Sequence, residues 1–280
     1  MKRWFKMILK SIVIGVAAFT GILFFGQHKL IWFPRAYGAA YKAELPKNAV
    51  ELRYTTSQGS QCSFYLPPKS AAAARPERVW VLFGGNGSLA LDWTDFLRND
   101  PDKNDGFLLV DYPGYGLCQG SAEPANIEES ADKALASLAA HLEMKPDELE
   151  SKLNVLGHSI GAALALQFAV HHPVRQVVLL SPFTSLREMG RRTVGWPLCL
   201  LVRHNMDNRA RLRELASLAP QPSVTIFHGT DDAVIPTGMG RSLAAMFPKM
   251  ITFHEVPGAT HDSIVDDAET EIFSAMNGGK

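Results

Sequence analysis

The stretch Leu153-Asn154-Val155-Leu156-Gly157-His158-Ser159-Ile160-Gly161 joins two kinds of predicted structure across one tight turn. Its first residues form an apolar run of strand length, and the alanine- and leucine-rich sequence that follows predicts a helix over 160–171. Glycines two positions before and two positions after Ser159 let a strand and a helix approach each other closely. The stretch therefore predicts a strand–turn–helix unit with Ser159 at the turn.

Similar apolar runs lie on both sides of this unit. They are Val79–Phe83, Phe107–Val110, Val177–Leu180, Val224–Phe227 and Ile251–Phe253. Continuous apolar runs of this length are typical of strands that are buried on both faces of a parallel sheet. Helices are predicted between and after the strands, and a hairpin is predicted before them; these segments are about 124–142, 160–171, 237–247 and 262–276, and Val50–Thr55 with Gln61–Leu66. The order predicts an α/β domain with an open, mostly parallel sheet and helices on both faces.

The organisation of the chain follows from the same pattern. Residues 27–48 contain Pro34, Gly38 and Pro46 and are interpreted as a connector. Residues 181–221 are longer than a simple crossover, and we expect a small helical cap there, over the strand ends where ligand sites form. The predicted domains are an N-terminal membrane anchor and connector over 1–34 and an α/β domain over 35–280.

Ser159 is the central residue of a G-x-S-x-G motif. Between a strand and a helix, this motif forms a nucleophile elbow, which exposes the serine hydroxyl at the N-terminus of the helix. The partial positive charge there favours a developing oxyanion. The alternative is a serine that only caps the helix. We predict a nucleophile, because the partners that a reactive serine needs follow it in the chain.

The predicted general base is His261, which follows the last strand. The order serine, acid, histidine is the one expected with a strand–elbow–helix nucleophile. His254 is the alternative, but it lies inside the predicted strand. The other nearby histidines are interpreted as structural or surface residues, namely His158, His171 and His172.

An acid must orient His261 and stabilise its charged form. Asp231 and Asp232 both follow the strand that ends at Phe227, and their positions alone leave both open. Asp207, in the predicted cap, is a more distant alternative.

An oxyanion would need two backbone donors. One is the amide of Ile160, directly after the nucleophile, and the other is expected in the loop after the Val79–Phe83 strand. Asn86 is predicted there because glycines on both sides let the backbone approach a substrate. The alternative is a flexible loop. A phosphate-binding loop is disfavoured because no G-K-[ST] follows.

These motifs together resemble the membrane-anchored α/β-hydrolase-domain proteins, a branch also called serine-aminopeptidase-like that includes protein depalmitoylases. The matching segments span about residues 79 to 262 in the same order and are 83–87, 111–116, 157–161, 181–186, 206–208, 228–236 and 257–262. The resemblance implies the α/β-hydrolase fold. It makes Asp232, the last aspartate of H-G-x-x-D-x-x-[VI]-P, the acid. It also places the oxyanion loop at Gly84-Gly85-Asn86, where Gly84 stands in place of the family's histidine.

The resemblance extends to the start of the chain. Trp32-Phe33-Pro34 is similar to the "FP" segment that follows the apolar start of anchored members. The lipid-modified cysteines that some relatives carry near the start are absent from this sequence, because its first cysteine is Cys62. A depalmitoylase role is therefore not carried over.

The N-terminal segment combines basic residues with an apolar run. Lys2, Arg3, Lys6 and Lys10 precede the run from Ser11 to Gly26, which contains no charge. The run is shorter than the ~20 residues of a spanning helix, but extension to Met7 or Phe33 supplies the length if Lys10 or Lys29 snorkels. We predict an uncleaved transmembrane signal-anchor. A cleaved signal peptide and a buried soluble helix are the alternatives, and no good cleavage site follows the run.

The charge distribution predicts how this anchor is oriented. Because the positive charges lie mainly before the apolar run, the N-terminus is expected in the cytoplasm and the catalytic domain on the non-cytoplasmic side, which is the periplasm in a bacterium. Lys+Arg and Asp+Glu are both 28, so no basic field is available for nucleic acid. The three cysteines have no metal-ligand spacing, and we expect neither a metal nor an organic cofactor.

The predicted activity is that of a serine hydrolase, carboxylesterase- or thioesterase-like, which cleaves ester, thioester or amide bonds through an acyl-serine intermediate. A membrane-tethered, non-catalytic binding protein and a serine peptidase are the alternatives. The apolar stretch Trp196–Val202 either lines the substrate pocket or packs on the core. With the anchor nearby, it favours small acyl or lipid-like substrates over peptides.

Overall fold

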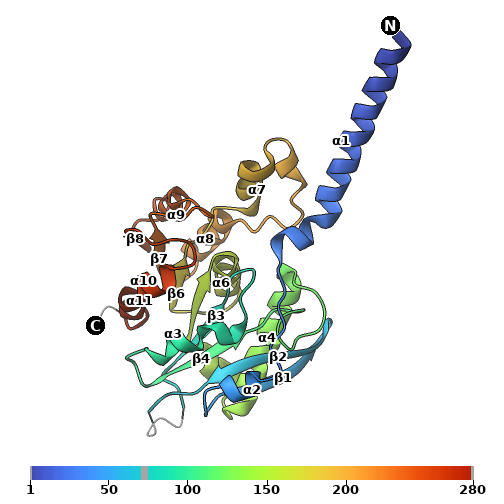
Figure 1. The fold of residues 1–280 in the computed structure, drawn as a ribbon. Coiled ribbons are helices and arrows are strands. Elements are labelled where there is room, and N and C mark those ends of the chain that lie inside the picture. The colour runs from blue at the N-terminus through green and yellow to red at the C-terminus, as the bar shows by residue number, and fades with distance from the viewer. Residues whose placement is uncertain (1, 71–74, 279–280) are drawn as a thin grey trace.

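An eight-stranded sheet lies at the centre of the computed structural model, which describes residues 2–70 and 75–278 (Figure 1). The strands are β1 (Val50–Thr56), β2 (Gly59–Leu66), β3 (Arg78–Phe83), β4 (Asp105–Val110), β5 (Leu153–His158), β6 (Gln176–Leu180), β7 (Ser223–Gly229) and β8 (Ile251–Val256). Their spatial order is β1-β2-β4-β3-β5-β6-β7-β8. Only the pairs β1–β2 and β2–β4 are antiparallel, so the predicted hairpin and mostly parallel sheet are confirmed.

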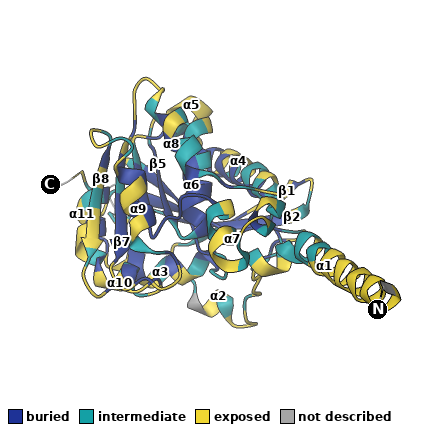
Figure 2. Cartoon of the chain, turned by 90° about the horizontal axis from the view of Figure 1, so that it is seen from above, coloured by how far each residue is buried: buried dark blue, intermediate teal, exposed yellow. Residues whose placement is uncertain are grey.

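Two apolar layers bury the two faces of this sheet. In β3, Val79 and Val81 face one layer, and Trp80 and Leu82 face the other, as expected where successive side chains point to opposite faces. The central strands are buried on both faces, which explains why their sequences are continuously apolar rather than alternating. Figure 2 shows these buried strands between the layers of helices.

Each sheet face has its own set of helices. The first face packs against α4 (Pro124–His141), α6 (Ile160–His171), α8 (Asn208–Ala216) and α9 (Thr237–Ala244), and the second against η1 (Ala90–Trp93), α3 (Thr94–Arg98), α10 (Ile264–Asp267) and α11 (Glu269–Met276); α5 (Pro146–Glu150) precedes β5. The single helix predicted over 262–276 is wrong in detail. Ala268 departs from helical geometry, with φ −118° and ψ 19°, and divides the segment into α10 and α11.

The segment 181–221 contains the raised part of the molecule. There α7 (Leu186–Val194) and η2 (Leu198–Leu201) stand above the carboxyl ends of the strands (Figure 1). We call these two elements the cap. The third helix of the segment, α8, packs against α6 and so belongs to the helix layer.

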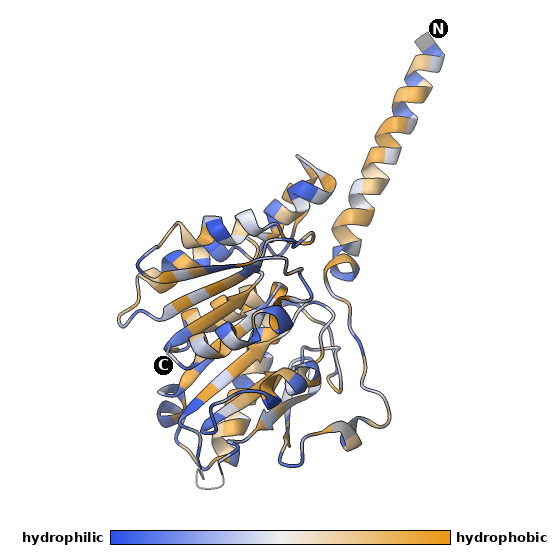
Figure 3. Ribbon diagram, turned by 60° about the vertical axis from the view of Figure 1, so that its left-hand side comes forward, coloured by the Kyte–Doolittle hydropathy of each residue, from blue (hydrophilic) through white to orange (hydrophobic). Residues whose placement is uncertain are grey.

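A long helix, α1 (Lys2–Ile31), projects from the domain (Figures 1 and 3). It is long and apolar enough to cross a membrane, a property that a signal sequence shares. None of its apolar window is buried inside the molecule, so the alternative of a buried soluble helix does not hold. The helix continues past residue 27, where a connector was predicted to begin, because Gln27 and His28 hydrogen-bond to the domain. The connector itself contains the short helix α2 (Tyr41–Glu44).

Candidate active site

The turn at Ser159 has the geometry expected of a nucleophile elbow. Ser159 has φ 58° and ψ −119°, a conformation that non-glycine residues rarely adopt. Its amide donates a hydrogen bond of 2.9 Å to the carbonyl of Leu180 on the neighbouring strand, which holds the turn in place. The strand β5 ends directly before Ser159, and α6 begins directly after it.

The glycine at position 161 is required by close packing. A Cβ atom at Gly161 would lie 2.1 Å from the carbonyl oxygen of Phe83 and 2.4 Å from that of Gly84. The first turn of α6 therefore lies directly against the end of β3. This contact brings the Gly84–Gly87 loop next to the serine, and a Cβ atom at Gly85 would lie 3.8 Å from the Cβ of Ser159.

The structure brings Ser159, His261 and Asp232 into one hydrogen-bonded chain. Nε2 of His261 lies 2.9 Å from Oγ of Ser159, and Nδ1 lies 2.8 Å from Oδ2 of Asp232. Because a carboxylate oxygen accepts, Nδ1 carries the proton, which leaves Nε2 free to accept one from the serine. His261 and Asp232 are both buried, so water competes little with these hydrogen bonds.

The carboxylate of Asp232 is held in its ionised form. Its Oδ1 accepts hydrogen bonds from the amides of Val234 (2.9 Å) and Ile235 (2.7 Å). Burial alone would raise the pKa of this carboxyl, but hydrogen bonds from His228, His261 and the Ile235 amide lower the pKa well below its usual range. The charge that an orienting acid needs is therefore present at neutral pH.

The competing acids lie elsewhere. Asp231 is exposed, and its Oδ1 accepts a hydrogen bond from Thr230 Oγ1 at 3.1 Å. Asp207 caps the N-terminus of α8 by accepting from the amide of Ala210. Only Asp232 among the three contacts His261 in the structure.

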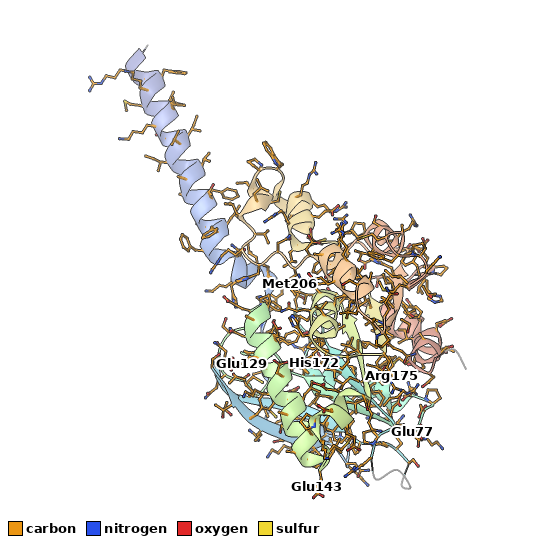
Figure 4. All side chains as sticks on the ribbon, turned by 180° about the vertical axis from the view of Figure 1, so that it is seen from behind. Glu77, Glu129, Glu143, His172, Arg175 and Met206 are labelled. Atoms are coloured by element: carbon orange, nitrogen blue, oxygen red, sulfur yellow. The ribbon has the colours of Figure 1, made fainter. Side chains whose placement is uncertain are left out.

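The competing histidines are also accounted for. His254 is exposed on β8, where its ring stacks on Phe227 at 4.7 Å between centroids. His171 and His172 lie at the C-terminal end of α6, the opposite end from Ser159, and pair with Glu128 and Asp132 (Figure 4).

Two further histidines support the chain in ways that the sequence analysis did not predict. His158 Nε2 donates to the carbonyl of His261 at 3.0 Å, and the two rings lie 4.9 Å apart. Burial, together with the nearby His261, lowers the pKa of His158 to about 4, so it is neutral at pH 7. His228 is fully buried and donates from Nε2 to the carbonyl of Ile235 at 2.8 Å, which fixes the loop that carries Asp232. Their positions within the two motifs were the available signal.

The loop that contains Asn86 is held from two sides. The Asn86 carbonyl accepts from the Tyr115 hydroxyl at 2.5 Å and from the Phe33 amide at 3.0 Å. These bonds fix the loop, in contrast to the flexible-loop alternative. Ile160 is the first residue of α6, and its amide has no acceptor within that helix. Asn86, Ser159 and Ile160 all line one cavity.

This cavity has a volume of about 280 Å³ and lies between the catalytic edge, the cap and α1. Its lining comprises Leu23, Gln27, Leu30, Ile31, Asn86, Ser159, Ile160, Phe183, Leu186, Met189, Gly190, Thr193, Val194, Leu198, Leu201, Val202, Val234 and Ile235. No charged side chain occurs among these described lining residues. Within residues 2–70 and 75–278, no group of three or more His, Cys, Asp or Glu side chains is placed to hold a metal ion.

Residues 80–221, about half of the chain, match the alpha/beta hydrolase family. The chain belongs to this family. An uncharacterized protein of Mycobacterium tuberculosis is 28% identical to this hydrolase over 267 residues, which cover 94% of this chain and 90% of that protein. The uncharacterized protein YfhR of Salmonella typhi is 26% identical over 232 residues, covering 77% and 75% of the two chains.

Solved structures of other alpha/beta hydrolases share the fold. An alpha-beta hydrolase of Vibrio vulnificus superposes with a TM-score of 0.67 at 16% identity and covers 93% of each chain. An esterase of Pyrococcus furiosus superposes with a TM-score of 0.60 at 14% identity, covering 89% of this hydrolase and 97% of the esterase. The predicted fold class is confirmed, and the family and fold support a hydrolase.

Proposed function

We propose that this hydrolase cleaves ester, thioester or amide bonds of acyl compounds through a covalent intermediate on Ser159, with His261 as general base and Asp232 as its orienting acid. The observation that carries the proposal is the hydrogen-bonded chain from Asp232 through His261 to Ser159, at 2.8 and 2.9 Å, on the edge of an apolar cavity. A serine hydroxyl becomes an effective nucleophile when such a base is adjacent.

The reaction proceeds in two halves. Oγ of Ser159 attacks the carbonyl carbon while its proton passes to Nε2 of His261, and the amides of Ile160 and Asn86 hold the oxyanion. The bond to the leaving group then breaks, and His261 returns the proton to that group. A water molecule, deprotonated by His261, attacks the acyl-serine and releases the acid with free Ser159.

The composition of the cavity favours acyl groups over peptides. A pocket that recognises a free substrate amine needs a carboxylate, and none occurs among the described lining residues. An acyl chain instead gains ~0.8 kcal/mol for each CH₂ that it buries. This difference favours esterase or thioesterase activity over the aminopeptidase alternative.

We further propose that α1 is an uncleaved anchor, with its N-terminus in the cytoplasm and the domain on the other side of the membrane. The basic residues before the apolar run support this orientation. Trp32, directly after α1, is buried and its ring lies 5.8 Å from that of Tyr112. Cleavage within α1 would remove the residues that join the helix to the domain. The domain division at 34/35 remains a prediction.

The test uses the full chain in detergent, a fluorophosphonate probe and p-nitrophenyl acyl esters. Ser159→Ala is expected to abolish both labelling and hydrolysis. The matched control Ser242→Ala, at an exposed position on α9, is expected to retain both.

Undiminished labelling of Ser159→Ala would overturn the proposal. A folded native protein with neither labelling nor turnover would favour the non-catalytic binding alternative. Faster turnover of amino-acid anilides than of the matched esters would favour a peptidase.

A further inference from the structure

The end of α1 forms one wall of the catalytic cavity. Leu23, Gln27, Leu30 and Ile31 line it together with Ser159. Their spacing of four, seven and eight residues from Leu23 places them on one face of the helix. A helix that served only as a tether would not need to share a cavity with the nucleophile.

Hydrogen bonds fix this wall to the cap. The side-chain amide of Gln27 donates from Nε2 to the Leu201 carbonyl at 3.2 Å, and its Oε1 accepts from the Arg203 amide at 2.9 Å. Both polar ends of one side chain therefore bind the segment that starts in η2. The position of α1 relative to the cap is thus specified by polar contacts and not by apolar contact alone.

A second attachment holds α1 to the main domain. Nε2 of His28 lies 2.8 Å from Oγ of Ser121 and 3.0 Å from the carbonyl of Ala122. Five residues later in the chain, the Phe33 amide donates to Asn86, the residue proposed to hold the oxyanion. The wall is therefore connected to both the cap and the catalytic edge.

The surroundings of the cavity are apolar on the side of α1 and on the side of the cap. Phe25 of α1 is 80% exposed, and on the cap Trp196 is 74% and Leu200 55% exposed. The cap and α1 both rise from the same side of the domain in Figures 1 and 3. Large apolar side chains that remain exposed together mark a surface with an apolar partner, and the apolar length of α1 makes that partner a bilayer.

We propose that α1 is part of the acyl-binding site, and that an acyl chain from the bilayer enters the cavity between α1 and the cap. The side chain of Leu23, half-buried on the cavity face, then limits the length of acyl chain that the site accepts. This inference rests on the proposed acyl-serine function. It makes residues 35–280 an incomplete site, because four lining residues lie before residue 35.

The test compares two adjacent positions of α1 in the full chain, reconstituted in vesicles. Leu23→Trp fills the cavity face, whereas Ile22→Trp is the matched control at a position that is 70% exposed and absent from the lining. Leu23→Trp is expected to lower kcat/KM for a C12 p-nitrophenyl ester by about tenfold relative to the C4 ester. Ile22→Trp is expected to leave that ratio unchanged.

A second variant guards against misfolding. Leu23→Ala enlarges the cavity and is expected to shift the preferred chain length upward, with fluorophosphonate labelling retained. An unchanged C12-to-C4 ratio in both Leu23 variants, with labelling intact, would overturn the inference and leave the proposed function standing. Loss of labelling from the native protein would overturn the proposed function itself, and the inference with it.

The source of the acyl chain needs its own arm. Vesicle-resident C12 ester is expected to be hydrolysed faster than the same acyl chain presented as a water-soluble thioester. Equal rates for the two, with the Leu23 effect present on both, would contradict entry from the bilayer.

Discussion

The catalytic edge and the wall made by α1 and the cap are built in different ways. At the edge, Asp232 receives two backbone amides and two histidines, and the backbone of Ser159 is bonded to β6. In the wall, apolar side chains make most of the contacts, and the amide of Gln27 supplies hydrogen bonds to the cap. The first region depends on backbone geometry, and the second on side-chain volume.

This difference separates the chemistry from the choice of substrate. A side chain held by several directional bonds loses its function when one atom changes. An apolar wall instead tolerates substitution and changes the size of the space that it encloses. We therefore expect changes at the edge to alter turnover of every substrate, and changes in the wall to alter turnover selectively.

The largest effect is expected from Asp232→Asn, which keeps the shape of the side chain but removes the charge. Without the carboxylate, His261 can adopt the wrong tautomer, and kcat should fall by about 10⁴ for short and long acyl esters alike. The exposed neighbour offers a matched control, and Asp231→Asn should leave kcat within about twofold. Steady-state kinetics on C4 and C12 esters measure both variants.

The reverse result at this pair would assign the acid to Asp231. A loss confined to the C12 ester would also contradict the comparison, because it would place Asp232 among the residues that select the substrate.

The sequence predicted the edge far better than the wall. Ser159 and His261 are recognisable because local rules fix their places: a glycine-flanked turn after a buried strand, and a loop after the last strand. The choice between Asp231 and Asp232 needed the motif, since neighbouring residues after a strand point in different directions. The structure now places Asp232 against His261, while its catalytic role remains a prediction.

The wall could not be predicted because it depends on contacts between distant segments. Gln27 bonds to Leu201 and Arg203, more than 170 positions further along the chain. Hydrophobic periodicity finds an apolar helix but does not say which face meets another element. The polar pair Gln27-His28, at the end of an apolar run, was the one local signal that this end of α1 is attached.

An intermediate effect is expected from His158→Gln, which tests whether the edge depends on a neutral histidine. The pKa of His158 is lowered from 6.5 to about 4 by burial and by the neighbouring His261. Between these values the unfolded chain binds a proton at this position and the folded protein does not. Stability is therefore full above pH 6.5 and is lost as the pH falls toward 4, by up to about 3 kcal/mol.

The variant should lose less stability over this pH range than the native protein, as measured by thermal unfolding in detergent from pH 4 to pH 8. Asp111 acts in the opposite sense, because burial raises its pKa to about 7, but both proteins share that group. The difference between their two pH curves isolates His158. Parallel curves would show that His158 is already protonated in the folded protein.

The smallest effect is expected from Leu200→Asp, which changes the outer surface of the cap and leaves the cavity lining unchanged. Because α1 already holds the domain at the membrane, loss of one apolar contact should lower hydrolysis of vesicle-resident C12 ester only about threefold. Hydrolysis of C4 ester in detergent should not change. Its neighbour Leu201 lines the cavity, so Leu201→Asp should instead lower C12 hydrolysis in vesicles and in detergent.

The pair Leu200→Asp and Leu201→Asp also tests which way the cap faces. If the cap contacts the bilayer through its exposed residues, the effect of Leu200→Asp must depend on the presence of vesicles, and that of Leu201→Asp must not. Equal losses in detergent for both variants would mean that the cap moves and that Leu200 enters the cavity. The wall would then be a mobile lid, and the acyl-length limit would belong to the cap more than to Leu23 of α1.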